Sequence, residues 1–440
     1  MDISELPWSD AYMNVGDPIG YVIPEWPGQT HLWIWREVSH LRELGATVRL
    51  FSTRRPPERD KARHAFVDQA VAETTYLWPT GFFRILVALL SSFVRNPLGF
   101  LRCITLVFTL PVDHKQPIRQ LLPLLLPACV LAEEVRRGGI RHLHSHSPAN
   151  SSILCMMVKR LTGVPFSQMV NANLEWWGGA MREKFHDAKF TVACTDWMVA
   201  QIHRDYPELE ASAYGMCRVA VDVRKWTAMK RTPAADGVLK ILSVSRLVAS
   251  KGQDDLLKAI ALLTKRGCRV RLRIGGNGPE LESLQKLAGE LGISELVTFL
   301  GSLAEDQYLE EMRNTDLFVL ASHGEPMGVV YMEAMATEAG TIGTSAGGVG
   351  EIITSGENGL LVPPKNPEAL ADGIEKLLND PKLRHALGEA GRRTVLQKFD
   401  SRVWAGEMYR RIYGVLPAMT LELTNDKPAR GDTEKPAMVA

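Results

Sequence analysis

Two glutamates eight positions apart could hold the hydroxyl groups of a sugar. Glu325 follows a short apolar run that predicts a strand, and Glu333 stands where the next helix is predicted to begin. Ionised carboxylates only accept hydrogen bonds, so they suit vicinal hydroxyls of a hexose or a ribose. Gly328, between them, allows backbone N–H groups to approach a ligand closely. Glu333 alone could equally be an acid that stabilises the first turn of its helix.

A basic loop earlier in the chain could bind phosphates. Arg246 and Lys251 lie between the predicted strand 239–244 and a predicted helix. An arginine can contact two phosphate oxygens at once, a lysine supplies a point charge, and a helix N-terminus adds a favourable dipole. The pair suits a diphosphate leaving group. An isolated Arg and Lys are more often a solvated surface pair, so the neighbouring motifs decide between the two interpretations.

Three glycine-containing segments accompany these residues. The segment 276–280 (Gly-Asn-Gly-Pro-Glu) opens a loop after a predicted strand, and Asn358-Gly359 predicts a turn into another strand. Gly347-Gly348, in the segment 347–351, could form a tight turn with exposed N–H groups. Each segment is a weak signal alone, but their order and spacing together with the charged residues are specific.

The whole set resembles the retaining GT-B glycosyltransferases of family four, which use nucleotide-sugars to build polysaccharides and glycolipids. The shared motifs are strand–Arg–x4–Lys, Gly-x-Gly-Pro-Glu, Glu–x7–Glu with Ala-Met-Ala, Gly-Gly-x-Pro-Glu and Gly-x-x-Gly-Leu-Leu-Val-Pro, and the match covers roughly residues 239–400. Within this range, two elements depart from the family pattern. Residues 337–340 replace a Gly-x-Pro element, and Gly350 stands where proline is usual.

The resemblance implies a role for each residue of the set. Arg246 and Lys251 would neutralise the donor diphosphate, Glu325 would hold the transferred sugar, and Glu333 would hold the ribose. The donor would be a UDP- or GDP-sugar, and transfer would retain the anomeric configuration. Neither a metal nor another cofactor would be needed, because the two cations supply the electrostatic stabilisation. Further donor contacts would come from Gly276, Met327, Gly328, Val329 and Val330.

The N-terminal half resembles the same enzymes more loosely and would bind a saccharide or lipid-linked acceptor. Relatives carry a Thr-x-His-x-x-Asp-like element whose histidine lines the reaction centre, whereas this chain has Asn171 and Asn173 there. Asparagine can orient a hydroxyl group but cannot take its proton. For Trp176 and Trp177, stacking on a sugar and burial in the core are both open. The acceptor-side candidates are Gly28, His146, Glu175 and Trp176.

Three histidines alternate along the predicted strand 140–146. His142, His144 and His146 would share one face of that strand, and histidines at this spacing could bind a metal. No acidic or cysteine partner is evident in the sequence. We therefore expect histidines that line the core or the cleft, and no metal site.

Two other functions stay open. A nucleotide-sugar-binding subunit of a glycan-assembly complex with impaired catalysis would fit the replacement of the usual histidine by Asn171. Two α/β domains could also belong to a dinucleotide oxidoreductase, but no Gly-x-Gly-x-x-Gly motif follows the first strand. The net charge of +1 offers no global field that would attract nucleic acid.

The elements that must position these residues predict two domains. The strand 20–23, the helix 31–44 and the strand 47–51 form a βαβ opening, and strands alternate with helices again in the second half. The predicted fold class is therefore α/β, with two Rossmann-like, doubly wound domains facing a central cleft as in GT-B. The expected parts are an acceptor-side domain 1–226, a linker 227–237, a nucleotide-sugar domain 238–400, a helix 401–416 that packs back on the first domain, and a disordered tail 420–440.

Residues 82–132 contain three apolar runs separated by basic residues. Each run is shorter than the roughly 20 apolar residues needed to span a bilayer. The segment could be helices packed into the N-terminal domain or a basic amphipathic surface at a membrane interface, and both interpretations stay open. The six cysteines form no C-x-x-C pair and the N-terminus has no signal-peptide pattern, so a cytoplasmic protein is expected, free or at the inner face of the membrane.

Overall fold

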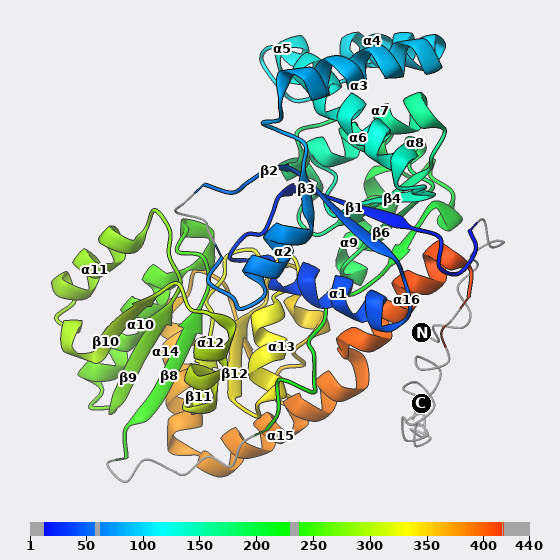
Figure 1. Ribbon diagram of the computed structural model, residues 1–440. Helices are drawn as coiled ribbons and strands as arrows, with labels where there is room; N and C mark the ends of the chain where they lie inside the picture. Colours follow the sequence, from blue (N-terminus) through cyan, green and yellow to red (C-terminus); the bar gives the residue numbers. More distant parts are fainter. Residues whose placement is uncertain (1–12, 58–61, 229–236, 416, 418–440) are drawn as a thin grey trace, which may run out of the picture.

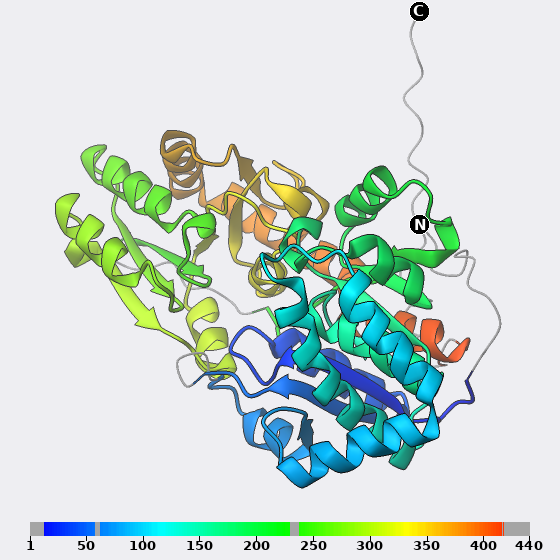
Figure 2. The ribbon, with the colours of Figure 1, turned by 90° about the horizontal axis from the view of Figure 1, so that it is seen from above.

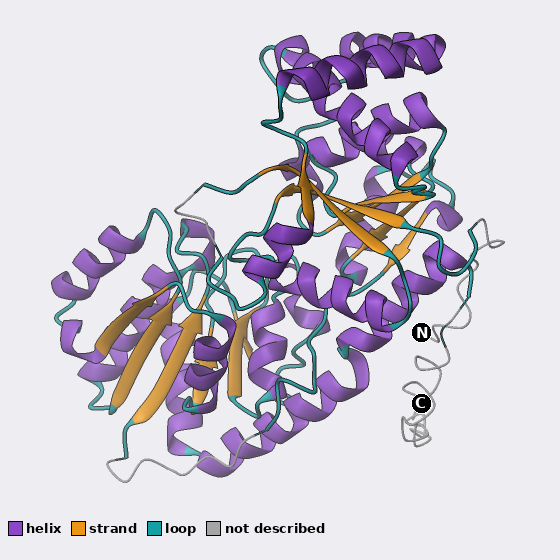
Figure 3. Ribbon diagram, in the orientation of Figure 1, coloured by secondary structure: helices purple, strands orange, loops and turns teal. Residues whose placement is uncertain are grey.

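The computed structural model describes residues 13–57, 62–228, 237–415 and 417, and these residues form two α/β domains (Figure 1). The N-terminal sheet has seven strands in the order β3-β2-β1-β4-β5-β6-β7, and the C-terminal sheet has six in the order β10-β9-β8-β11-β12-β13. Neighbouring strands in both sheets are parallel. Helices lie on both sides of each sheet (Figure 3). The predicted fold class of two Rossmann-like domains is confirmed.

The N-terminal domain opens with the predicted βαβ unit and continues through five more strands. The strands are β1 (Ile19–Glu25), β2 (Val48–Arg54), β3 (Thr74–Tyr76), β4 (His142–Ser145), β5 (Phe166–Val170), β6 (Phe190–Ala193) and β7 (Tyr214–Met216). The helices are α1 (Leu32–Glu43), α2 (Val67–Glu73), α3 (Phe82–Arg95), α4 (Pro97–Thr109), α5 (Pro117–Leu121), α6 (Leu125–Arg137), α7 (Asn150–Thr162), α8 (Met181–Asp187) and α9 (Asp196–Asp205), with short 3-10 helices η3 (Leu122–Leu124), η4 (Leu174–Trp177) and η5 (Ala211–Ala213).

The C-terminal domain repeats the same alternation. Its strands are β8 (Leu239–Val244), β9 (Val270–Gly275), β10 (Val297–Gly301), β11 (Leu317–Val319), β12 (Gly340–Thr344) and β13 (Leu360–Val362). Its helices are α10 (Gln253–Lys265), α11 (Leu281–Glu290), α12 (Glu305–Arg313), α13 (Val329–Ala336), α14 (Pro367–Asn379) and α15 (Pro381–Lys398), with the 3-10 helices η6 (Ala249–Lys251), η7 (Ser294–Leu296) and η8 (Gly347–Glu351).

Strand β1 shows why a central parallel strand is apolar throughout. Tyr21 and Ile23 pack into the core on the side of α1, whereas Val22 between them packs into the core on the side of α6 and α7. Successive side chains of a strand point to opposite faces, so a strand covered by helices on both faces needs apolar residues on both. Figure 1 shows the strand between these two helical layers.

The chain crosses between the domains twice, and the two crossings lie side by side. The N–H of Val221 donates to the carbonyl of Phe399 (3.0 Å), and the N–H of Ser401 donates to the carbonyl of Val221 (2.9 Å). The expected linker 227–237 begins after the first crossing, but residues 229–236 lie outside the described part of the chain, as does the expected tail 420–440.

After the second crossing, helix α16 (Ser401–Tyr413) returns to the N-terminal domain. It packs against α1, and the Tyr413 hydroxyl donates to the carbonyl of Asp17 at 2.9 Å. The Nη2 atom of Arg411 also donates to the carbonyl of Met216 at 3.0 Å. The last described helix therefore belongs to the N-terminal core and not to the domain from which it emerges.

Helices α3, α4 and α5 form an outer layer at the end of the N-terminal domain farthest from the C-terminal domain (Figure 1). Seen from above, they lie over the other N-terminal elements (Figure 2). They pack against α6 and α7, as one of the two interpretations of residues 82–132 predicts. Among the described residues, no single helix has both the length and the apolar character to cross a membrane, and one pair, α3 with α4, meets these criteria together but is bent by 112°.

Candidate active site

The strand order of each sheet reverses at its centre, between β1 and β4 and between β8 and β11. In open α/β sheets, ligands bind outside the carboxyl ends of the strands at such a reversal. The loops that follow these strands lie at the contact between the domains. The Nε2 atom of Gln29, after β1, donates to the carbonyl of Leu303, after β10, at 2.7 Å. The charge of Arg246, in the loop after β8, also acts on His31, after β1, so the loops at the two reversal points approach each other across the domain boundary that the predicted fold class assigns as the cleft.

Lys251 and Glu325, which are 74 positions apart in the sequence, form an ion pair on the C-terminal side of the cleft. Their Nζ and Oε2 atoms are 2.6 Å apart, and the Ser322 hydroxyl donates to the same carboxylate oxygen at 3.3 Å. Glu325 is only 8% exposed. Gly252 brings the two loops together, because a Cβ atom there would lie 2.0 Å from the carbonyl oxygen of Ala321. The structure thus joins two residues that the sequence placed in separate motifs.

Arg246 lies at the exposed end of the same basic loop. The loop after β9 supports it through close backbone contacts that require glycine. Gly276 has a φ of +128°, and a Cβ atom there would lie 1.8 Å from the carbonyl oxygen of Ser245. A Cβ atom on Gly278 would lie 2.2 Å from the carbonyl oxygen of Leu247. Gly276 therefore acts here by letting two loops touch, which keeps the Arg246 loop in place.

Gly328 begins helix α13 with a φ of +83°, a conformation that favours glycine. A Cβ atom there would lie 2.5 Å from the ring of Tyr331, whose hydroxyl donates to the carbonyl of Leu320 at 2.9 Å. Met327 is buried, and Val329 and Val330 are partly buried. The first N–H groups of α13 have no acceptor within their own helix and carry the positive end of its dipole, so they can meet an anionic or hydroxyl-bearing ligand.

The prediction that Glu333 enters a helix at its first turn is wrong. Glu333 is the fifth residue of α13 and is buried, and its carboxylate Oε1 lies 2.7 Å from Nη1 of Arg36 on α1. Helix α13 begins earlier because Gly328 already supplies its N-terminal turn. Burial raises the pKa of Glu333, and the charge of Arg36 offsets part of this increase.

Arg36 contacts two carboxylates of the opposite domain. Its Nη2 atom lies 3.1 Å from Oε1 of Glu305, and Lys225 Nζ lies 2.9 Å from the other oxygen of Glu305. Arg36 is 7% exposed, and although burial lowers its pKa, the charges of Glu333 and Glu305 raise it above the usual value. We call Arg36, Lys225, Glu305 and Glu333 the interdomain charge cluster.

Glu351 makes a second polar connection between the domains. Its carboxylate accepts hydrogen bonds from the backbone N–H groups of Asp196 (3.0 Å) and Trp197 (2.7 Å), at the start of α9. It also pairs with Nη1 of Arg218 at 2.6 Å. A carboxylate at a helix N-terminus satisfies orphan N–H groups and the helix dipole. The motif that ends in Glu351 therefore helps to fix the N-terminal domain against the site.

The predicted tight turn at Gly347-Gly348 is also wrong in its details. The segment forms the 3-10 helix η8, and the N–H of Gly348 is not exposed but donates to the carbonyl of Glu325 at 3.0 Å. A Cβ atom on Gly347 would lie 2.2 Å from that same carbonyl oxygen. The segment thus supports the backbone of Glu325.

On the N-terminal side, Gly28 positions His31. The N–H of Gly28 donates to Nδ1 of His31 at 3.1 Å, so the neutral ring carries its proton on Nε2. The ring stacks on Trp26 with centroids 6.0 Å apart. Burial, followed by the charges of His146 and Arg246, lowers the pKa of His31 to about 4. His31 is therefore a neutral hydrogen-bond donor at the rim of the cleft, which the sequence reading did not single out.

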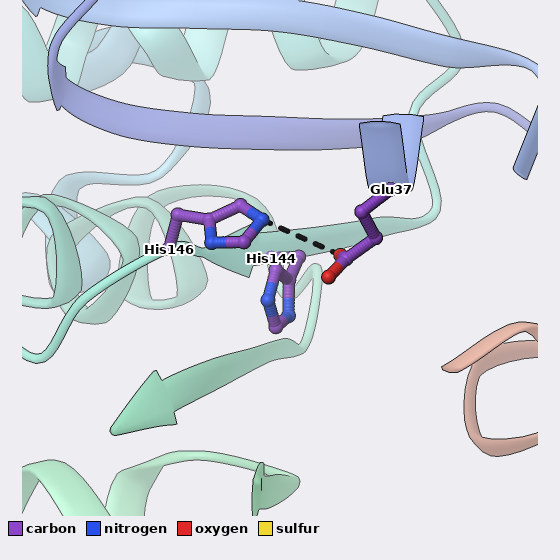
Figure 4. Close-up of side chains that lie close together, drawn as sticks. All are labelled: Glu37, His144 and His146. Carbon is purple, nitrogen blue, oxygen red and sulfur yellow. Dashed lines mark ion pairs between the residues drawn. The ribbon is translucent and has the colours of Figure 1, made fainter. Parts of the chain in front are cut away.

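His146 is buried and lies in a polar cluster with Glu37 of α1 (Figure 4). Its Nε2 atom is 3.3 Å from Oε1 of Glu37, and the Tyr21 hydroxyl donates to the same oxygen at 2.7 Å. One potential ligand atom from each of Glu37, His144 and His146 falls within 4.8 Å of the others. The statement that these histidines have no acidic partner is therefore wrong, because α1 supplies one.

The three histidines do not act as one set. The Ser167 hydroxyl lies between His142 Nε2 (2.7 Å) and His144 Nδ1 (2.8 Å), and His142 stacks on Phe190. All three histidines are buried, as expected for residues of the core. Strand β4 ends at Ser145, one residue before His146, because the Ser145 hydroxyl donates to the carbonyl of Ser147 and the chain turns. The strand is thus shorter than the predicted segment 140–146.

The two asparagines lie after β5, next to this turn. The Asn171 Nδ2 atom donates to the carbonyl of His146 at 3.2 Å, so this side chain ties together the ends of β4 and β5. Asn173 precedes the 3-10 helix η4 and is partly buried, and Glu175 in η4 is exposed. Asn171 thus contacts the backbone of His146 and not its imidazole ring.

The two neighbouring tryptophans differ in exposure. Trp176 is exposed, whereas Trp177 is partly buried and donates through Nε1 to the carbonyl of Ala172 at 3.2 Å. Both tryptophans line a cavity of about 530 Å³ at the carboxyl ends of β1 and β2. Glu25 and Arg54 from these strand ends also line the cavity. An exposed ring at the mouth of such a cavity is available to stack on a ligand.

The interdomain charge cluster yields a stability prediction. Replacing Arg36 by Met should leave Glu333 buried without its cation and lower the free energy of unfolding by about 3 to 5 kcal/mol. Thermal unfolding measures this loss. The matched control is Arg266→Met, because Arg266 also contacts two carboxylates at 2.7 Å but on the surface, and its loss should be much smaller. Equal losses in the two variants would show that the cluster does not hold the domains together.

The lowered pKa of His31 yields a pH prediction. The unfolded chain binds a proton at about pH 6.5 and the folded chain only near pH 4, so stability is present above this window and is lost as the pH falls through it. At pH 5, His31 should account for about 2 kcal/mol of the loss relative to pH 7. Unfolding midpoints at pH 7 and pH 5 should therefore converge in His31→Gln. The exposed His385 provides the control, and an unchanged pH difference in His31→Gln would contradict the assignment.

Comparisons with known proteins fit this geometry. Residues 224–394 match the family model described as Glycosyl transferases group 1. The chain is 34% identical over 149 residues to alpha-D-kanosaminyltransferase of Streptomyces kanamyceticus, covering 34% of this chain and 39% of that protein. It is 30% identical over 181 residues to the GDP-mannose-dependent alpha-(1-6)-phosphatidylinositol monomannoside mannosyltransferase of Mycolicibacterium smegmatis, covering 40% of this chain and 47% of that protein. The chain thus spans less than half the length of these curated relatives.

The structural likeness extends over both domains. The structure of Anabaena HepE in complex with UDP superposes with a TM-score of 0.67 at 16% identity, covering 91% of this chain and 100% of that chain. At this identity the likeness concerns the fold. The chain therefore has the GT-B fold of two facing Rossmann-like domains, and the match to the glycosyl transferases group 1 model falls on the C-terminal one.

Proposed function

We propose that the protein is a retaining hexosyltransferase that moves a sugar from a UDP- or GDP-sugar to a saccharide or lipid-linked acceptor in the synthesis of a polysaccharide or cell-surface glycan. The observation that carries this proposal is the Lys251–Glu325 pair, which lies at the strand reversal of the C-terminal sheet with Arg246 in the same loop. This arrangement combines cations for a diphosphate with a carboxylate for sugar hydroxyls. The relative in Mycolicibacterium smegmatis, which is GDP-mannose-dependent, supports the donor class.

The cations would act on the leaving group. As the bond between the sugar and the diphosphate breaks, negative charge grows on the phosphate oxygens, and Arg246 and Lys251 would stabilise it without a metal. Lys251 already contacts Glu325, so the charge of this carboxylate holds the ammonium in position. Glu325 would in turn accept hydrogen bonds from the sugar, which places the anomeric carbon next to the two cations.

Glu333 would accept the ribose hydroxyls through the part of its carboxylate that Arg36 leaves open. Arg36 contacts Oε1, and an ionised carboxylate has about four lone-pair positions. Because Arg36 belongs to the N-terminal domain, its contact with Glu333 would link the donor site to the position of that domain. A ligand held by Glu333 would be enclosed by both domains.

The acceptor would bind on the N-terminal side of the cleft. Asn171 cannot take a proton, and its amide group is used by the carbonyl of His146. Retention of configuration fits an acceptor hydroxyl that attacks the anomeric carbon on the face from which the diphosphate departs. On that face, the departing phosphate oxygen would be the nearest base for the proton of the acceptor hydroxyl. In this scheme Asn171 and Asn173 orient the acceptor, and catalysis does not depend on a base at these positions.

A nucleotide-sugar-binding subunit without turnover is the alternative, favoured by the same loss of a titratable group at Asn171. Purified protein can be incubated with UDP-, GDP-, TDP- and ADP-sugars while thermal stability and released nucleotide are followed. Stabilisation by one donor with slow nucleotide release supports a transferase. Stabilisation without release, even with candidate acceptors, supports the binding subunit, and no stabilisation by any donor overturns both.

Glu325→Gln should lower transfer by about 100-fold or more, because the amide keeps the shape of the side chain but loses the charge that holds Lys251 and the sugar hydroxyls. Turnover of the donor identified above is measured alongside the unfolding midpoint, which should change little. Glu290→Gln on the exposed side of α11 is the control substitution. If Glu325→Gln turned over at the wild-type rate, the donor-site assignment would be wrong.

A further inference from the structure

The outer layer of the N-terminal domain is unusually apolar on its outside. Twelve of the eighteen exposed large apolar side chains in the described part of the chain lie between residues 82 and 122, on α3, α4, α5 and η3. Folded proteins rarely leave a contiguous apolar patch of this kind uncovered unless it is an interaction site. We call this surface the α3–α5 face; its most prominent members are Phe82, Phe83, Leu90, Val94, Leu98 and Phe108.

Helix α3 exposes its apolar side, whereas an ordinary surface helix buries that side against the domain. Helix α3 buries the small residues Ala88 and Ser92 against the domain and exposes Val87, Leu90 and Val94, which are 52%, 56% and 75% exposed. The spacing of three and four residues places the exposed side chains on one stripe of the helix. The apolar stripe therefore faces away from the protein core, which indicates that it contacts something else.

Both helices are attached to the domain along their inner sides. Ser91 of α3 donates to Glu133 of α6 at 3.1 Å, and Asn96, between α3 and α4, donates to the carbonyl of Arg160 of α7 at 3.0 Å. A Cβ atom on Gly99 would lie 2.2 Å from that carbonyl oxygen, so α4 lies directly on α7. With 14 residues, α3 is about 21 Å long and too short to cross a hydrocarbon core of about 30 Å. Helix α4 has 13 residues and is bent by 112° from α3, so neither helix is long enough to span the core alone, and both pack along the domain surface.

The charged residues around the α3–α5 face indicate which kind of surface it can bind. Between residues 82 and 122 the only acidic residue is Asp113, whereas five basic side chains are exposed: Arg84, Arg95, Arg102, Lys115 and Arg119. Two copies of such a face would repel each other, whereas an anionic lipid surface would attract it. Apolar side chains ringed by arginine and lysine are typical of elements that lie in a membrane interface.

The face continues toward the acceptor side of the cleft. Leu122 is exposed on the face, and its neighbour Leu124 lines the cavity of about 530 Å³ at the ends of β1 and β2. Trp78 and Trp176, 46% and 57% exposed, also line this cavity. Tryptophan is enriched where an apolar environment meets water, so both rings suit a boundary between acyl chains and water at the mouth of the cavity.

From these observations we propose that the α3–α5 face docks on an anionic phospholipid bilayer, with the apolar stripe inserted among the acyl chains and the basic residues at the headgroups. The docking itself is independent of the proposed function. Its consequence rests on that function: an acceptor with a lipid portion would reach the cavity directly from the bilayer, which favours the lipid-linked acceptor over a free saccharide.

The test is flotation of the full chain with vesicles of phosphatidylcholine, alone or mixed with phosphatidylglycerol, without any nucleotide-sugar. The wild type should float with the anionic vesicles and less with the neutral ones. The variant Val87→Glu/Leu90→Glu/Val94→Glu should lose at least about tenfold in binding, since carboxylates at the interface are disfavoured and are repelled by anionic headgroups. The control is Leu396→Glu, which removes an apolar side chain 42% exposed on α15 and should bind as the wild type does.

Three results would overturn the proposal. One is a wild type that does not float with anionic vesicles, and another is a triple variant that floats equally well while keeping the wild-type unfolding midpoint. The third is a wild-type dimer in solution that becomes monomeric in the triple variant, because a second copy would then cover the face. Nucleotide release is measured separately, so loss of vesicle binding with intact donor turnover rejects the docking alone, and vesicle binding without donor binding rejects the proposed transferase alone.

Discussion

The guanidinium of Arg36, inserted between Glu333 and Glu305, fixes where the two domains meet. Each group of this cluster would be costly to bury alone, and only their contact across the domain boundary compensates the lost hydration. The cluster therefore requires α1 of one domain to lie against α12 and α13 of the other. Because α1 follows β1 and α13 follows β11, the same contact brings the reversal points of both sheets to one cleft. The residues proposed to bind the donor depend on this arrangement for an enclosed site.

Within the C-terminal domain, close backbone contacts at glycines fix the positions of the loops that hold the site residues. Gly252, Gly276, Gly328 and Gly347 lie where a Cβ atom would fall within 1.8 to 2.5 Å of a neighbouring atom. Gly252, Gly276 and Gly347 let one loop touch another, so the loops after β8, β9, β11 and β12 support one another, whereas Gly328 leaves room for the ring of Tyr331. Lys251 and Glu325 are thus held by a network of loops, and a single loop would position them less well.

The fold and the donor side of the site could be predicted because their signals are local in the sequence. Strand β8 coincides with the predicted segment 239–244, and the order of the C-terminal motifs follows the order of the loops at one sheet edge. The partners of buried charges could not be predicted in this way. Glu37 beside His146 and Arg36 beside Glu333 are pairs between distant segments, and nothing in the local pattern indicates which acid meets which base.

The central claim is that Lys251, held by Glu325, binds the diphosphate of a nucleotide-sugar. Calorimetric titration of UDP and GDP into the wild type and into Lys251→Ala tests it directly, with Lys286→Ala on the exposed side of α11 as the control. One nucleotide should bind the wild type and the control alike, and its affinity for Lys251→Ala should fall by at least about tenfold, since a charge-assisted contact to phosphate is lost. Equal affinity for all three proteins would contradict the account.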